Sequence, residues 1–137
     1  DEAERVIRLV FVTSRYRNCR GEHLAVVTVA VPEAEQRLRV SIERVSDVGD
    51  DPAATCLAAC QFAAAMPLVA VEYDAEFENL RLVSETVIAD GSLTQLQLQA
   101  LLDRMVDGVE IWQAVRDRGQ KGDRWLPDAE NQTEKAA

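Results

Sequence analysis

The sequence predicts an α+β domain in which two helices cover one face of a mainly antiparallel five-stranded sheet, in the order β-β-β-α-β-β-α. Five segments are rich in β-branched residues or alternate between apolar and polar side chains, as strands do. Two further segments have the composition or the apolar spacing of helices. Residues 1–119 suffice for a single core, whereas residues 120–137 are polar, show no period and predict a disordered tail.

The first two strands are expected on either side of a turn. Residues 5–17 (RVIRLVFVTSRYR) are dense in β-branched and aromatic residues and contain no Gly or Pro, which favours a strand. A helix is the alternative there, because short apolar runs do not separate the two. Residues 18–21 (NCRG) have turn chemistry. Residues 23–31 (HLAVVTVAV) are nearly all apolar, which predicts a strand that is buried on both faces or lies centrally in the sheet.

Residues 37–45 (RLRVSIERV) alternate between apolar and polar side chains, which predicts a strand with one face in water. The expected core-facing residues are Leu38, Val40 and Ile42, and the expected water-facing residues are Arg39, Ser41 and Glu43. After a polar break, residues 53–65 (AATCLAACQFAAA) predict an alanine-rich helix. Asp50 or Asp51 can cap this helix, Pro52 suits its first position, and Pro67 ends it.

Residues 68–76 and 79–88 predict a second strand pair, and Asp90 with Gly91 breaks the chain after it. Residues 93–118 then predict the last helix, with a capping box formed by Ser92 and Gln95. Its apolar face consists of Leu98, Leu101, Leu102, Met105, Val109 and Trp112. Gly108 interrupts this helix, which predicts close contact with another element, and Gly119 suits the C-cap.

The composition limits the classes of partner. The chain has 24 acidic and 15 basic side chains and a net charge of −9. This balance argues against nucleic acid and anionic membranes, because phosphate contacts need clustered cations. No apolar run reaches the roughly 18 residues that a membrane helix needs. Three cysteines without a basic signal region predict reduced thiols and a cytoplasmic protein.

Three segments resemble the YbjN-like family of bacterial sensory transduction regulators, whose fold is similar to that of type III secretion chaperones. They are residues 65–69 (AMPLV), 71–74 (VEYD) and 90–94 (DGSLT), the last followed by Leu98, Leu101 and Leu102. The resemblance covers roughly residues 22–118. It implies a chaperone-like module, often dimeric, that works without a cofactor or catalytic residues. Family members usually carry a helix before the first strand, and this chain, which lacks an initiator Met, starts too late to show one.

Cys56 and Cys60 lie four residues apart, and with Cys19 and His23 they could supply four zinc ligands. Their spacing matches no common zinc motif, and their alanine-rich surroundings predict thiols buried in packing; metal binding and redox pairing are the alternatives. Cys19 with His23 is the nearest approach to a catalytic dyad, although solvated turn residues are the simpler interpretation. We therefore predict no catalytic, cofactor-binding or metal-binding residue.

Four acidic residues surround the second strand pair: Glu72, Asp74, Glu76 and Glu78. They could offer oxygen ligands to a cation, but a charged edge that discourages strand addition is the favoured interpretation.

The candidate partner contacts are Arg15, Arg17, Arg39 and Trp125. Arg15 and Arg17 belong to a local basic cluster, and Trp125 is an aromatic residue in a polar tail, where such residues can anchor an interface. The predicted function is a non-enzymatic protein-interaction module that binds a client segment, or a second copy of itself, against the sheet or its edge. The alternative is a small-ligand sensor whose pocket would use Tyr73, Arg81 and Ser84.

Overall fold

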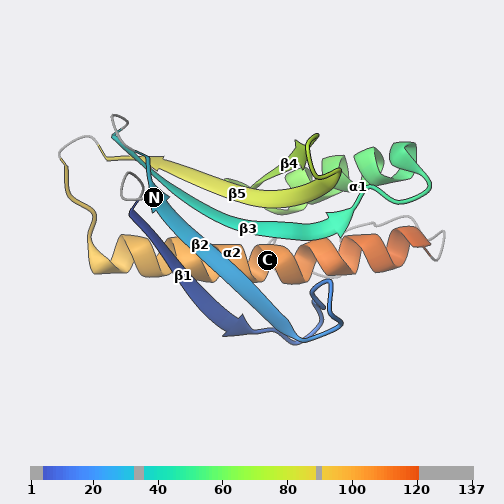
Figure 1. Ribbon diagram of the computed structural model, residues 1–137, viewed down its shortest axis with the longest axis horizontal. Helices are drawn as coiled ribbons and strands as arrows, with labels where there is room; N and C mark the ends of the chain where they lie inside the picture. The colour runs from blue at the N-terminus through green and yellow to red at the C-terminus, as the bar shows by residue number, and fades with distance from the viewer. Residues whose placement is uncertain (1–4, 33–35, 89–90, 121–137) are drawn as a thin grey trace, which may run out of the picture.

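The computed structural model describes residues 5–32, 36–88 and 91–120, and Figure 1 shows their arrangement. The elements follow the predicted order. The strands are β1 (Arg5–Val12), β2 (Leu24–Val31), β3 (Arg37–Asp47), β4 (Ala70–Asp74) and β5 (Asn79–Val87), and the helices are α1 (Pro52–Ala65) and α2 (Gln95–Gln120). The predicted tail after residue 120 lies outside the described residues.

The sheet has the strand order β1-β2-β3-β5-β4, and every pairing is antiparallel. The long helix α2 runs along one face and packs against β2, β3 and β5 (Figure 1). The shorter helix α1 packs against α2 and beside β4. The α+β class and the five-stranded antiparallel sheet are therefore confirmed, and β1 and β4 form the two edges.

The core lies between α2 and the sheet face that it covers. Alternate residues of β2, β3 and β5 point into this core, as do residues on one stripe of α2. The most completely buried of them are Val27, Val40, Ile42, Leu82, Met105, Val109, Trp112 and Val115. The Phe62 ring of α1 meets the Trp112 ring edge to face, with 5.6 Å between the centroids. Each buried side chain of this size contributes roughly 1.5–3 kcal/mol.

Gly108 marks the place where α2 comes close to the end of α1, as its position in the sequence predicted. A Cβ atom at Gly108 would lie 3.7 Å from a Val69 side-chain atom and 3.8 Å from atoms of Met66 and Phe62. The glycine is buried, and α2 continues through it without a break. Gly108 therefore lies where α2 contacts the end of α1 and Val69, the residue before β4.

Several predicted boundaries differ from the structure, among them those of the first strand and the last helix. The first strand ends at Val12, because the Thr13 hydroxyl donates to the Tyr16 carbonyl and turns the chain. The last helix begins at Gln95, with its capping box formed by Thr94 and Gln97 instead of Ser92 and Gln95. The backbone N–H of Gln97 donates to the Thr94 hydroxyl at 3.2 Å. In return, the backbone N–H of Thr94 donates to the side-chain carbonyl oxygen of Gln97 at 2.9 Å.

The alternation in β3 is confirmed on its apolar face, where Leu38, Val40 and Ile42 are buried. Ser41 was expected in water and is instead buried, because it lies between Thr28 of β2 and Val83 of β5. Strand β2 lies between β1 and β3, as one of the two expectations for it has it, but it is not buried on both faces, because its buried residues face α2 and Val26 is exposed. The sheet face opposite α2, called the outer face below, is therefore open over β2.

Candidate protein-binding surface

Strand β1 forms an unprotected edge of the sheet. It pairs with β2 alone among the described strands, so its other edge carries backbone N–H and C=O groups without a neighbouring strand. Such an edge is a template for a further strand. The strand holds no Pro, and its only charged residues are Arg5 and Arg8. With no Pro and only two charged residues, β1 has little that would block the addition of a further strand.

Apart from Arg5 and Arg8, the side chains of β1 are apolar, and some of them are exposed on each face. On the outer face, Val10 is 64% and Val12 82% exposed, and Val10 lies opposite the exposed Val26 of β2. Together with Val6 they form what we call the outer apolar patch: Val6, Val10, Val12 and Val26. On the α2-facing side, Ile7 is 61% exposed. Side chains of this kind gain free energy when a partner covers them.

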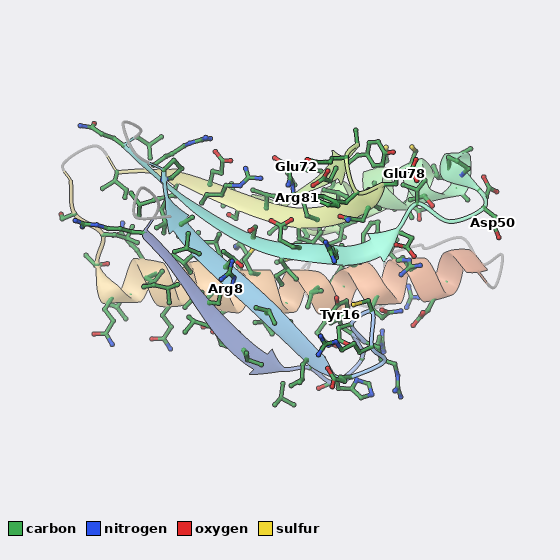
Figure 2. All side chains as sticks on the ribbon, viewed as in Figure 1. Arg8, Tyr16, Asp50, Glu72, Glu78 and Arg81 are labelled. Atoms are coloured by element: carbon green, nitrogen blue, oxygen red, sulfur yellow. The ribbon has the colours of Figure 1, made fainter. Side chains whose placement is uncertain are left out.

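The outer face of β3, β5 and β4 is charged and already paired. We call this group the ion-pair ladder: Arg37, Arg39, Glu43, Glu72, Asp74, Arg81 and Glu85. Arg39 bonds to Glu72 at 2.7 Å and also to Glu85, which Arg37 bonds as well. Figure 2 shows Arg81 beside Glu72, and the Arg81 Nε atom lies 2.9 Å from the Glu72 carboxylate.

The ion pairs lower the pKa values of two carboxyls in the ladder, Glu72 and Glu85. Hydrogen bonds from Arg39 and then Arg81 hold the pKa of Glu72 below its ordinary value despite partial burial. At Glu85, desolvation acts to raise the pKa, but hydrogen bonds from Arg39 and Arg37 outweigh it and lower the pKa. Both carboxylates are therefore charged at neutral pH, and each has an arginine as its partner.

The structure places the predicted contact residues apart. Arg15 and Arg17 are exposed in the loop between β1 and β2, where the Arg17 guanidinium donates to the Gly21 carbonyl at 3.1 Å. Arg39 lies on the outer face near the opposite end of that hairpin, because it pairs with Ala30, which pairs with Val6. Its guanidinium is held in the ladder. Trp125 lies outside the described residues.

The β1–β2 loop is anchored on α2. The backbone N–H groups of Ser14 and Arg15 each donate to one oxygen of the Glu110 carboxylate at 2.7 Å. Tyr16, labelled in Figure 2, lies between the anchored amides and the second strand. It is buried, and burial raises its pKa to about 12. The His23 ring nitrogen Nδ1 lies 3.0 Å from the Tyr16 carbonyl. The loop therefore holds the far end of β1 in a fixed position.

The positions of the two helical cysteines differ from the expectation that they are buried. Cys19, Cys56 and Cys60 are all exposed, although the two helical cysteines were expected in packing. Only Phe62 of α1 is fully buried, because the helix touches α2 and β4 along one narrow side. Within residues 5–32, 36–88 and 91–120, no three or more His, Cys, Asp or Glu side chains gather as a metal site. The four-ligand zinc set and a Cys19–His23 dyad thus have no support from the geometry.

Two of the four acidic residues near β4 make ion pairs or hydrogen bonds within the fold. Glu72 and Asp74 both bond to Arg81, the latter at 3.3 Å. The other Asp74 oxygen accepts the backbone N–H of Glu76 at 3.0 Å and so shapes the turn. Glu78, shown at the turn in Figure 2, is exposed with a φ of 51°. These contacts agree with a solvated, charged edge.

A cavity of about 360 Å³ lies between the β3–α1 connection, where Figure 2 shows Asp50, and α2. Its lining includes Asp50, Thr55, Trp112 and Arg116. The Trp112 indole nitrogen is buried and has no hydrogen-bond partner among the residues that the structure describes. The sequence pointed to Tyr73, Arg81 and Ser84 for a ligand pocket, and none of them lines this cavity.

Sequence reasoning missed several residues of this surface, among them Arg37, Glu85 and Glu110. The signal for the ladder was present, since Arg81 and Glu85 alternate with apolar residues in β5 as Arg39 and Glu43 do in β3. Opposite charges on neighbouring strands stabilise a sheet. Only the strand order β3-β5-β4 shows which residues are neighbours.

No family model and no curated protein matches this chain. A chain of the crystal structure of the ExsC-ExsE complex superposes with a TM-score of 0.56 at 17% sequence identity, covering 83% of this chain and 77% of that chain. This match establishes the fold and agrees with the type III chaperone-like architecture expected from the sequence. Within the described residues, neither helix is long and apolar enough to cross a lipid bilayer.

Proposed function

We propose that this protein is a non-enzymatic, chaperone-like module that binds an extended segment of a client protein along β1. The observation that carries the proposal is the open edge of β1 with exposed apolar side chains on both faces. A client strand added there would bond to the free backbone groups and cover the outer apolar patch. The resemblance to YbjN-like regulators and the fold of a chain from a two-protein complex support this role, and we place it in the bacterial cytoplasm.

The test uses peptides selected against the immobilised full-length protein from a random display library, with affinities then measured by fluorescence anisotropy. Val10→Asp puts a charge in the outer apolar patch and should weaken binding by more than about tenfold, which is 1.4 kcal/mol. Leu96→Asp is the matched control, because Leu96 is an equally apolar residue, 78% exposed on α2. Amide hydrogen exchange should show new protection at alternate residues of β1. Equal binding by Val10→Asp and the native protein would refute this site.

In the absence of a client, we propose that a second copy occupies the same edge, with two β1 strands antiparallel about a twofold axis. Light scattering over a dilution series should then give a dimer for the native protein and a monomer for Val10→Asp. A dimer that persists in Val10→Asp would place the contact between copies on another surface.

A small-ligand sensor is the second candidate, and the cavity beside Trp112 favours it. An unpartnered buried indole N–H and the Arg116 guanidinium could both donate to a ligand there. A metabolite screen by thermal shift, repeated with Arg116→Ala, tests this function, because stabilisation follows ligand mass action. A hit whose stabilisation is unchanged in Arg116→Ala would bind elsewhere.

A further inference from the structure

Helix α1 presents two thiols on a side that nothing in the described structure covers. Its 14 residues include no charged side chain, in a chain of which 28% is charged. Cys56 and Cys60 are both exposed, and so is Leu57 between them. The thiols thus stand on a surface where the helix itself provides no carboxylate or amine to compete for an ion.

The two sulfurs are spaced for one shared ion. Residues four apart lie on the same side of a helix, with their Cβ atoms about 5–6 Å apart. A metal–sulfur bond is about 2.3 Å long, the value for Zn–S, so two such bonds in line would hold the two sulfur atoms about 4.6 Å apart. Each sulfur is one bond from its Cβ atom, so rotation about the Cα–Cβ bonds can bring the sulfurs from the roughly 5–6 Å Cβ separation to this spacing. The helix does not have to bend.

The same spacing excludes a disulfide within the intact helix. A disulfide needs Cβ atoms about 3.8 Å apart, which is well below the separation of two residues one helical turn apart. The pair therefore stays a dithiol as long as α1 is folded, and the redox pairing considered from the sequence would require α1 to unwind.

We propose that Cys56 and Cys60 form a two-thiolate site for a soft monovalent cation of the Cu(I) class. Thiolate is the ligand type that such ions prefer. A tetrahedral Zn²⁺ ion needs four ligands, and no third Cys, His, Asp or Glu joins the pair within the part of the chain that the structure describes. Each thiol loses its proton to solvent on binding, so one bound Cu(I) leaves a complex with a charge of −1. No electron is transferred.

The experiment titrates Cu(I) into the reduced full-length protein under anaerobic conditions, in competition with a coloured Cu(I) chelator. One Cu(I) per chain is expected. Cys56→Ser and Cys60→Ser should each weaken binding by about 100-fold or more, since loss of a residue that merely orients a ligand already costs 10–100-fold. Cys19→Ser is the matched control, because Cys19 is an exposed thiol in the β1–β2 loop. It should bind as the native protein does.

Several results would overturn the site. These are native binding by Cys56→Ser or Cys60→Ser, loss of binding by Cys19→Ser, or stoichiometric Zn²⁺ binding that displaces Cu(I). One Cu(I) per two chains with a doubled mass would also overturn it, because the ion would then bridge copies. Circular dichroism should match among the variants, since the substituted side chains are exposed. The titration needs no client, so its outcome is separate from that of the peptide-binding test.

Discussion

Arg39 bonds to two carboxylates at once, that of Glu72 in β4 and that of Glu85 in β5. Both carboxyls have a pKa below the ordinary value in the folded protein. A group with a lowered folded-state pKa stabilises the fold above its unfolded pKa, and that contribution is lost as the pH falls through the folded pKa. The ladder therefore adds stability at neutral pH and loses it in acid.

Replacing Arg39 by Ala should lower the free energy of unfolding at neutral pH by about 1 kcal/mol, the usual upper range for partly exposed pairs. At roughly pH 3, where the freed carboxyls are protonated, the difference should shrink. Urea unfolding at the two pH values measures this, with Arg8→Ala as the control, since Arg8 lies on β1 outside the ladder. An equal loss at both pH values would assign the effect to packing.

Glu110 fixes the β1–β2 loop through two backbone amides. Glu110→Ala should speed hydrogen exchange at Ser14 and Arg15 and cost about 1 kcal/mol, because hydrogen bonds to a charged group are lost at an exposed site. Asp103→Ala, which removes another exposed carboxylate of α2, is the control and should leave the loop unchanged. Unchanged exchange in Glu110→Ala would show that the loop holds its position without the anchor.

At the level of elements, α2 depends on its N-terminal cap. Thr94→Ala should destabilise the protein by about 1 kcal/mol, since the backbone N–H of Gln97 loses its acceptor, the Thr94 hydroxyl. Thr94→Ser keeps the hydroxyl and should restore most of the stability. Thermal unfolding of the three proteins checks this, and an equal loss in both variants would mean that the Thr94 methyl group, and not the hydroxyl, stabilises the helix.

Gly108 offers a test of how closely α2 meets α1. The nearest atoms lie at ordinary contact distance from a Cβ, so Gly108→Ala should fit and stabilise the helix by about 0.5–1 kcal/mol. Gly108→Leu should destabilise by about 1–3 kcal/mol through overpacking against Phe62 and Met66. Urea midpoints measure both changes. Destabilisation by Ala would show that the helices lie closer together than these distances indicate.

For the molecule as a whole, local periodicity was enough to predict the fold class and the element order. The alternation of residues 37–45 reports which side of β3 meets the core, and this needs no knowledge of its neighbours. The cysteines of α1 could not be placed in this way, because an alanine-rich helix is apolar on every side and its sequence does not show which side is covered. The partners of Arg39 depend on strand order, which arises only when the whole sheet assembles.

The ion-pair ladder has a consequence for long-range forces. Its three arginines and four carboxylates leave a net charge of only −1, out of −9 for the whole chain. The ladder itself therefore adds little net charge to the field that a partner meets at the outer face, so salt should change the ladder's contribution to affinity only weakly. Peptide binding at β1 should fall by less than about threefold between 0.05 and 0.5 M salt, whereas recognition through unpaired charge would weaken far more steeply. Such a surface would select its partners by shape and apolar contact at any ionic strength that a cell maintains.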